Sequence, residues 1–397
     1  MKRFAVLLLV LILILCGCEG NAEETLPPET EAPTTLAEPT EPQSVETTQP
    51  PTEPPTEPPT EPEPDPIADL LATMTLEEKA GQVFFARCPD ANAAETAEKY
   101  QFGGYILFGR DFKNQTKEQM VRKIQNYQEV SKIPMLIGVD EEGGTVVRVS
   151  SNSNLRASKF KSPQKLFKEG GMERIVADAK EKDELLKSLG IHVNFAPVVD
   201  VTTNPKDFIY ERSFGQDGAT TAEFATALVG QMAQDKIGSV LKHFPGYGSN
   251  VDTHTGIAVD KRPLSTFLES DLLPFYAHTA GEGTTAILMS HNIMTCVDDQ
   301  LPVSLSPKAH SVLRTLLEFD GVIIPDGLDM KAVKEYAQNG DIAVMALLAG
   351  NDMLLTCDYT TGVPAIVKAV EDGTLPIDVL DAACYRILTW KHTLGLI

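Results

Sequence analysis

Residues 238–248 read Gly-Ser-Val-Leu-Lys-His-Phe-Pro-Gly-Tyr-Gly, and this stretch joins a short apolar run to polar side chains. The run Gly238–Leu241 has the length and composition of a buried parallel strand. Lys242 and His243 follow it directly. In barrels built of parallel strands and helices, the groups that do chemistry stand at the C-terminal ends of strands. The stretch therefore predicts one strand of an α/β fold with functional groups at its end.

The same pattern recurs along the chain. Six more apolar runs have strand length: Tyr105–Phe108, Met135–Val139, Val193–Val199, Ala286–Met289, Val322–Ile324 and Met353–Leu355. Amphipathic helices are expected at Asp69–Ala86 (with a Thr75/Glu78 capping box), Lys117–Glu129, Ile175–Leu189, Ala222–Gln234, Pro307–Glu318 and Ile342–Ala349. This alternation predicts a TIM-like (β/α)8 barrel forming a single catalytic domain over residues 67–397, with one strand not identified. A doubly wound sheet would show the same alternation.

The residues after the strands indicate chemistry on a glycosidic bond, which needs a carboxylate facing the anomeric carbon and a group that protonates the leaving oxygen. Asp326 follows a buried strand and precedes a glycine, so it can present a rigid carboxylate. Asp252 can orient His254, whose side-chain type has a pKa of about 6.5 and suits proton transfer in both directions. Donors and acceptors for sugar hydroxyls are offered by Lys242, His243, Arg212 and Asp140.

Several motifs in order along residues 67–397 extend this pattern: Asp140-x-Glu142-Gly143-Gly144-x-x-x-Arg148, Arg212-Ser213-Phe214-Gly215, Lys242-His243-Phe244-Pro245-Gly246-x-Gly248 with Asp252-x-His254, Asp326-x-Leu328-x-Met330, and Ala349-Gly350-Asn351-Asp352. Together they resemble the β-N-acetylglucosaminidase branch of glycoside hydrolase family 3.

The resemblance implies a TIM-like barrel and a retaining two-step mechanism without a metal or other cofactor. By position, Asp326 corresponds to the nucleophile, His254 to the acid/base and Asp252 to its partner. The residues that correspond to the substrate-binding set for the non-reducing N-acetylglucosamine are Asp140, Arg148, Arg212, Lys242 and His243.

The chain departs from the family pattern in four places. Tyr247 stands where the family usually has His, Thr145 replaces an Arg, and Pro325 replaces a Ser or Thr. The interval from Lys242 to His254 is one residue shorter than usual. These departures leave open an inactive sugar-binding lipoprotein, and the anchor described next would also suit a solute-binding lipoprotein. Whether water or phosphate accepts the sugar is open as well.

The N-terminus predicts export and anchoring. Lys2 and Arg3 precede an apolar run from Phe4 to Leu15, and residues 15–18 read Leu-Cys-Gly-Cys, which resembles a bacterial lipobox. Residues 1–18 are therefore expected to be a lipoprotein signal peptide, with Cys18 lipidated; the alternative is a plain cleaved signal. The protein is expected at the extracellular face of a bacterial cell membrane, held by its lipid anchor alone.

The net charge of −22 has two sources. Residues 19–66 hold 13 acidic residues and 14 prolines and no Lys or Arg, so they predict a disordered Pro/Thr/Glu-rich linker. Residues 67–397 carry the remaining −11 after Lys2 and Arg3 are set aside. This balance argues against nucleic-acid binding. The expected partners are N-acetylglucosaminides and muropeptides, acted on by a monomer.

Some residues favour structural roles. Glu141 and Glu142 are adjacent and should point apart, with Glu142 as an acceptor at the turn before Gly143. His291 is equally compatible with the pocket and with a buried structural role, and Trp390 is expected to be packed in a helix. The remaining cysteines lack metal or disulfide spacing and are expected to be small buried hydrophobes: Cys88, Cys296, Cys357 and Cys384.

Overall fold

The computed structural model describes residues 64–250, 256–336 and 341–397. The predicted signal peptide with Cys18 and residues 19–63 of the predicted linker lie outside this range, as do Asp252 and His254. The described chain begins with α2 (Pro66–Ala72), which Asp65 caps by accepting from the Ile67 and Ala68 amides. No helix within the described ranges has the length and apolar character needed to cross a membrane.

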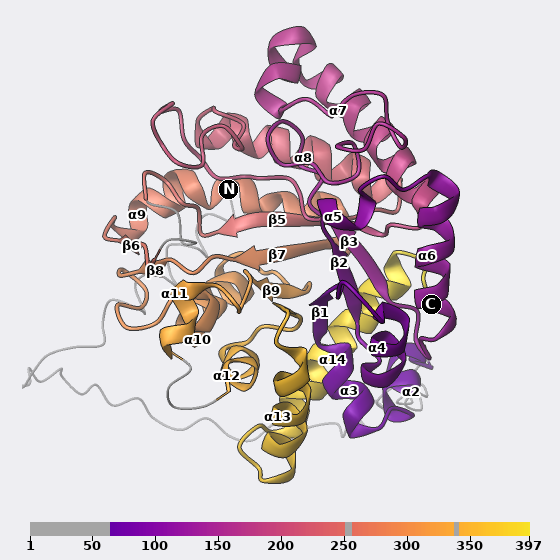
Figure 1. Cartoon of the computed structure of the whole chain (residues 1–397). Coiled ribbons are helices and arrows are strands. Elements are labelled where there is room, and N and C mark those ends of the chain that lie inside the picture. Colours follow the sequence, from indigo (N-terminus) through magenta and orange to yellow (C-terminus); the bar gives the residue numbers. More distant parts are fainter. Residues whose placement is uncertain (1–63, 251–255, 337–340) are drawn as a thin grey trace, which may run out of the picture. The chain divides into compact units, whose positions relative to one another are not determined.

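Eight parallel strands form one sheet in the order β10-β1-β2-β3-β4-β5-β7-β9 (Figure 1). Their bounds are β1 (Phe84–Arg87), β2 (Gly104–Leu107), β3 (Leu136–Val139), β4 (Val193–Asn194), β5 (Gly238–Phe244), β7 (Thr285–Met289), β9 (Ile323–Pro325) and β10 (Leu354–Thr356). The Asp352 and Met353 amides both donate to the Ile323 carbonyl, which joins the last segment to β9. The sheet is thus nearly closed into a barrel, as predicted, and a doubly wound sheet is excluded. A separate two-stranded sheet pairs β6 (Val259–Asp260) with β8 (Ile293–Met294).

The strand that the sequence did not reveal is β1, and the helix predicted over Asp69–Ala86 was wrong in extent. The chain instead forms α2, a second helix α3 (Leu76–Gln82) with the predicted Thr75/Glu78 capping box, and then β1. Phe84 and Phe85 are fully buried, and β1 pairs with both β10 and β2. Consecutive apolar residues fit a helix spacing as well as a buried strand, and here the pairing with two neighbours decided the outcome.

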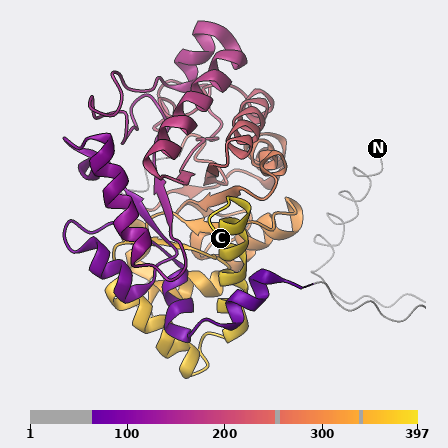
Figure 2. The same ribbon diagram turned by 90° about the vertical axis from the view of Figure 1, so that its right-hand side faces the viewer.

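Helices surround the sheet (Figures 1 and 2). The longer ones are α4 (Ala93–Tyr100), α6 (Lys117–Glu129), α7 (Pro163–Leu189), α8 (Gly218–Gln234), α12 (Ile342–Ala349), α13 (Tyr359–Glu371) and α14 (Ile377–Thr393). The predicted bounds of α6 and α12 are confirmed, whereas α7 begins earlier and breaks at Gly170 and Gly171. The helix predicted over residues 307–318 consists of α10 (Pro307–Ser311) and a π-helical segment η4 (Val312–Leu316).

Shorter helical segments occupy the connections. They are α5 (Gly109–Phe112), α9 (Leu264–Thr266), η1 (Phe267–Asp271), η2 (Leu273–Gly281), η3 (Val303–Leu305) and α11 (Lys331–Lys334).

The N-terminal end of the barrel is closed by α14. Trp390 donates through Nε1 to the Thr284 carbonyl just before β7, at 2.8 Å, so its predicted packing role is confirmed. Lys391 is fully buried and donates to Gln82 just before β1, at 2.6 Å. Polar groups for chemistry are therefore left to the opposite end, where the strands finish.

The cysteine prediction was half right. Cys88 and Cys384 are buried, but Cys296 and Cys357 are exposed, and all four are free thiols. Cys296 lies in the turn after β8 and Cys357 directly follows β10, so neither cysteine is part of a strand.

Candidate active site

A cavity of about 400 Å³ opens at the C-terminal ends of the barrel strands. Its lining includes residues on or directly after all eight strands of the barrel sheet, from Arg87 on β1 to Thr356 on β10. The predicted residues that line it are Asp140, Arg148, Arg212, Lys242, His243 and Asp326. These come from segments up to 186 positions apart, so the fold brings into one cavity every predicted site residue that the structure describes.

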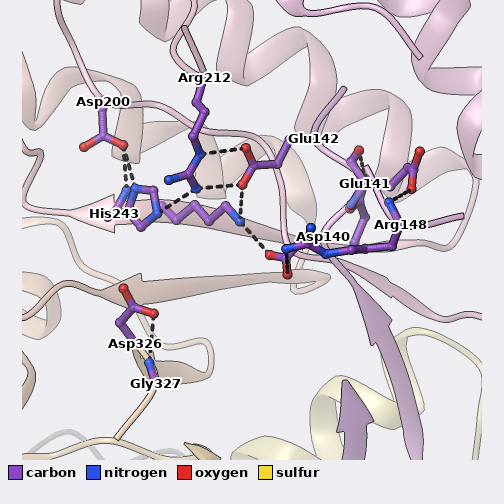
Figure 3. Close-up of polar contacts among 11 residues, drawn as sticks. Asp140, Glu141, Glu142, Arg148, Asp200, Arg212, His243, Asp326 and Gly327 are labelled. Atoms are coloured by element: carbon purple, nitrogen blue, oxygen red, sulfur yellow. Dashed lines mark hydrogen bonds and ion pairs between the residues drawn. The ribbon is translucent and has the colours of Figure 1, made fainter. Parts of the chain in front are cut away.

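The centre of the cavity wall is a row of alternating charges (Figure 3), here called the charged row: Arg212, Glu142, Lys242, Asp140 and Arg148. Arg212 binds Glu142 through two contacts, of 2.8 and 3.0 Å. The Lys242 ammonium lies 2.6 Å from Glu142 and 2.8 Å from Asp140. Arg148 Nη2 lies 3.4 Å from Asp140. Buried charges of opposite sign hold one another in place here.

The electrostatics of the row keep its members ionised. Burial alone would raise the pKa of Glu142, but attraction to Lys242 and Arg212 outweighs it and lowers that pKa to about 2. Burial opposes the charge on Lys242 too, yet Asp140 and Glu142 raise its pKa above the ordinary value. Burial likewise disfavours the charge on Arg212, but attraction to nearby carboxylates, Glu142 above all, raises the pKa of Arg212. The row therefore presents fixed donors and acceptors to a polar ligand.

His243 continues this network behind the row. Its Nδ1 lies 2.7 Å from Asp200, and its Nε2 lies 3.2 Å from Arg212 Nη2. Because a guanidinium can only donate, Nε2 accepts and the ring proton sits on Nδ1, facing Asp200. Asp200 also accepts from the amides of His243 and Tyr247. Asp200 thus fixes the tautomer and orientation of His243.

Consecutive residues of β5 both reach the cavity. A shift in the strand register between Lys242 and Phe244 marks a bulge in its pairing with β7. Bulges re-aim side chains near the ends of barrel strands. The charged end of Lys242 and the ring of His243 are consequently presented on the same side.

Glu141 and Glu142 point apart as predicted, but the role expected of Glu142 belongs to Glu141. Glu141 is the turn acceptor: it is fully buried and takes the amides of Arg148 and Val149, both at 2.7 Å. Glu142 belongs to the charged row instead. The reason is the turn at Gly143 and Gly144, both with positive φ, which folds residues 148–150 back over Glu141.

Asp326 follows β9 on the other side of the cavity. Its amide donates to the Met289 carbonyl at 2.8 Å, and its Oδ1 accepts from the Gly327 amide at 2.8 Å (Figure 3). Pro325 has no N–H to donate, but the hydrogen bonds between β9 and β7 continue through the amide of Asp326. The proline is therefore tolerated at the end of the strand. One carboxylate oxygen is thereby fixed while the side chain faces the cavity.

His291 holds the backbone that follows Asp326. It is fully buried, its Nε2 donates to the Gly327 carbonyl at 3.0 Å, and its Nδ1 lies 2.8 Å from the Ser304 hydroxyl. Of the two roles left open for His291, the structure favours the structural one.

Asp252 and His254 lie between the described residues Asn250 and Gly256. Asn250 contacts the Tyr247 carbonyl and Asp260, each through its side-chain amide.

Tyr247 itself lines the cavity, and its ring packs edge-on against His243 with centroids 5.1 Å apart. Thr145, another departure from the family pattern, is exposed.

Two residues of the site were missed as binding or positioning groups: Glu142 and Asp200. Asp200 directly follows the predicted strand that ends at Val199, and Glu142 lies three residues after Val139, which was the available signal. Among the described residues, no group of three or more His, Cys, Asp or Glu side chains is placed to hold a metal ion.

Comparisons with known proteins agree with this fold and site. The family model described as the glycosyl hydrolase family 3 N terminal domain matches residues 75–390. The chain is 30% identical over 333 residues to the beta-hexosaminidase LpqI of Mycobacterium tuberculosis, covering 81% of this chain and 84% of the relative. It is 33% identical over 287 residues to a beta-hexosaminidase of Glaesserella parasuis, covering 71% and 81%.

Solved structures extend the comparison. A glycoside hydrolase family 3 beta-N-acetylglucosaminidase from Paenibacillus sp. str. FPU-7 superposes with a TM-score of 0.75 at 27% identity, over 81% of this chain and 63% of that one. The structure of M. tuberculosis LpqI gives 0.70 at 28% identity, over 81% and 95%. The chain therefore belongs to glycosyl hydrolase family 3, as its motifs indicated, and it is a glycoside hydrolase.

Proposed function

We propose that the protein is a retaining exo-β-N-acetylglucosaminidase that releases terminal, non-reducing N-acetyl-β-D-glucosamine, with peptidoglycan fragments as its substrates. The observation that carries this proposal is the charged row facing Asp326 across one cavity. A row of fixed donors and acceptors suits the hydroxyl groups of a sugar, and Asp326 supplies the carboxylate that the chemistry needs. The names of the relatives as beta-hexosaminidases support the same substrate class.

The mechanism we propose has two steps. The Asp326 carboxylate attacks the anomeric carbon while His254, oriented by Asp252, protonates the departing glycosidic oxygen. His254 then takes a proton from water, which attacks the same carbon and frees Asp326. The binding set holds the sugar throughout: Asp140, Arg148, Arg212, Lys242 and His243.

The direct test is turnover of p-nitrophenyl N-acetyl-β-glucosaminide by the purified chain. We expect Asp326→Ala to lose most of the activity and His254→Ala to lose it mainly on substrates with poor leaving groups. Asp320→Ala, an exposed aspartate just before β9, is the matched control and should keep full activity. Unchanged rates in both site variants would rule out the assignment.

A catalytically weak sugar-binding protein is the second candidate. Tyr247, buried in the cavity where the family usually has His, is the observation that favours it. Calorimetric binding of N-acetylglucosamine without measurable hydrolysis would support this candidate. Product analysis with and without phosphate would identify the acceptor of the sugar.

The site of action is part of the proposal. Cys18 would carry the lipid that holds the enzyme at the outer face of a bacterial membrane, with a linker that ends before Asp65, the cap of α2. Cys18→Ala should move the protein from the membrane fraction to the soluble fraction. Size-exclusion chromatography of the released protein should show a monomer.

A further inference from the structure

Arg87, at the end of β1, lines the same cavity as the charged row but does not belong to it. Within residues 64–250, 256–336 and 341–397, its guanidinium has no hydrogen bond and no ion pair. Its Nε is buried and lacks a hydrogen-bond partner. Its guanidinium carbon lies 4.5 Å from the centroid of the Phe108 ring. Arg87 is thus a cation that no carboxylate of the described residues pairs with, although Asp326 and Asp329 line the same cavity.

Arg148 approaches the same aromatic ring. Its guanidinium carbon lies 5.4 Å from the Phe108 centroid, and its Nε is also buried without a hydrogen-bond partner. Among the described residues, its guanidinium contacts one carboxylate, that of Asp140, at a long 3.4 Å (Figure 3). Asp140 also pairs with Lys242. Two guanidinium groups therefore lie around one ring with little negative charge to balance them.

The other cations of the cavity are fully paired. Lys242 contacts two carboxylates, and Arg212 binds Glu142 through two nitrogens. Among the described residues that line the cavity, the guanidinium groups beside Phe108 are therefore the cations least engaged by carboxylates. A guanidinium stacked on an aromatic ring keeps its N–H edge available, and that edge matches the geometry of a carboxylate or a phosphate.

We propose that Arg87, positioned by Phe108 and assisted by Arg148, binds an oxyanion carried by the substrate, either a carboxylate or a phosphate. The proposal rests on the proposed glycosidase function of the same cavity. The domain as a whole carries −11, so the local pair of arginines selects an anionic sugar after encounter and does not attract it from a distance.

Two disaccharides with the same type of glycosidic bond test whether the oxyanion that Arg87 binds is a carboxylate. N-acetylglucosaminyl-β-1,4-N-acetylmuramic acid carries a lactyl carboxylate, and di-N-acetylchitobiose is neutral. We expect the wild-type chain to have the higher kcat/KM on the acidic disaccharide. Arg87→Gln should lower the ratio of the two kcat/KM values by about tenfold, and Arg87→Lys, which keeps the charge, should retain more of it.

The phosphate source is tested by inhibition. We compare N-acetylglucosamine 6-phosphate with N-acetylglucosamine as inhibitors of the wild type and of Arg87→Gln. Tighter inhibition by the phosphorylated sugar, lost in the variant, would identify phosphate as the group recognised. The matched control is Arg110→Gln, because Arg110 pairs with Asp90 outside the cavity lining, and it should leave both preferences unchanged.

The outcomes separate this inference from the proposed function. No preference for either anionic compound in the wild type, or a preference that survives in Arg87→Gln, overturns the inference. Failure to hydrolyse di-N-acetylchitobiose and p-nitrophenyl N-acetyl-β-glucosaminide would instead overturn the proposed function.

Discussion

The Nδ1 atom of His243 lies 2.7 Å from the carboxylate of Asp200, and Asp200 is almost wholly buried beneath the cavity. The two residues belong to different strand ends, 43 positions apart. Asp200 does not itself line the cavity but contacts His243, which does, so Asp200 acts through His243 as a positioning residue. The contact leaves His243 Nε2 next to Arg212, at the edge of the charged row.

Asp200→Asn should therefore weaken catalysis without removing a group that touches the sugar. An amide can donate to Nδ1 and so favour the other tautomer, which conflicts with Arg212. We expect kcat/KM for p-nitrophenyl N-acetyl-β-glucosaminide to fall by about tenfold or more. Asp207→Asn is the control, since Asp207 bonds Thr202 and Asn204 on the same loop. Wild-type kinetics in Asp200→Asn would contradict the positioning role.

Glu142→Gln should change how stability depends on pH. The pKa of Glu142 is about 2 in the folded protein against an ordinary 4.5, so the unfolded state binds the proton more readily. Its stabilising contribution, on the order of 3 kcal/mol, is complete above pH 4.5 and is lost as the pH falls toward 2. The variant should be less stable at pH 7, and the difference from wild type should shrink in acid.

Urea unfolding of both proteins at several pH values measures this difference as a free energy of unfolding. The exposed Glu211→Gln serves as the control. A constant difference between pH 7 and pH 3 would show that the ion pairs of Glu142 do not account for its stability effect.

Asp183→Asn, unlike Glu142→Gln, should raise the stability of the protein at neutral pH. Burial raises the pKa of Asp183 well above its ordinary value of 3.8, and Asp235 raises it further through charge and a hydrogen bond. The folded state thus binds the proton more tightly, and stability falls as the pH rises from 3.8 through the folded pKa. An asparagine has nearly the same size but does not titrate.

We expect the Asn variant to be more stable than wild type at pH 7, with no gain below pH 3.8. Thermal unfolding at the two pH values tests this expectation. A loss of stability at pH 7 would contradict a raised pKa of Asp183 in the folded protein.

Thiol titration should distinguish the two kinds of cysteine. In a chain with Cys16 and Cys18 replaced by serine, we expect dithionitrobenzoate to modify two thiols in the native state and four after denaturation. Cys296 and Cys357 are exposed, whereas Cys88 and Cys384 are buried. Burial also raises the pKa of Cys88 to about 11, which removes the reactive thiolate. Reaction of all four native thiols would contradict the burial.

Local patterns predicted those parts of the fold that local interactions determine. The bounds of α6 follow from its Thr116 cap and its apolar spacing, and those of α12 from its Asp341 cap. By contrast, β1 became a strand because β2 and β10 pair with it, and that information lies elsewhere in the chain.

The candidate site shows the same division. The motifs predicted which residues line the cavity, since strand ends meet at one side of a barrel. They did not predict which glutamate after β3 enters it, because that depends on the turn at Gly143, where an added Cβ would lie 2.3 Å from the Lys161 carbonyl oxygen. Nor did they reveal that Asp200 meets His243, a contact between separate loops.

The alternating charges from Arg212 to Arg148 have a stereochemical consequence. Donors and acceptors follow one another at fixed intervals along the wall, much as hydroxyl groups follow one another around a pyranose ring. Inverting one carbon of the sugar moves its hydroxyl away from the side chain that it would contact in this row, so that hydrogen bond is lost. The geometry should therefore distinguish epimers, and galacto-configured glycosides should be turned over more slowly than their gluco counterparts.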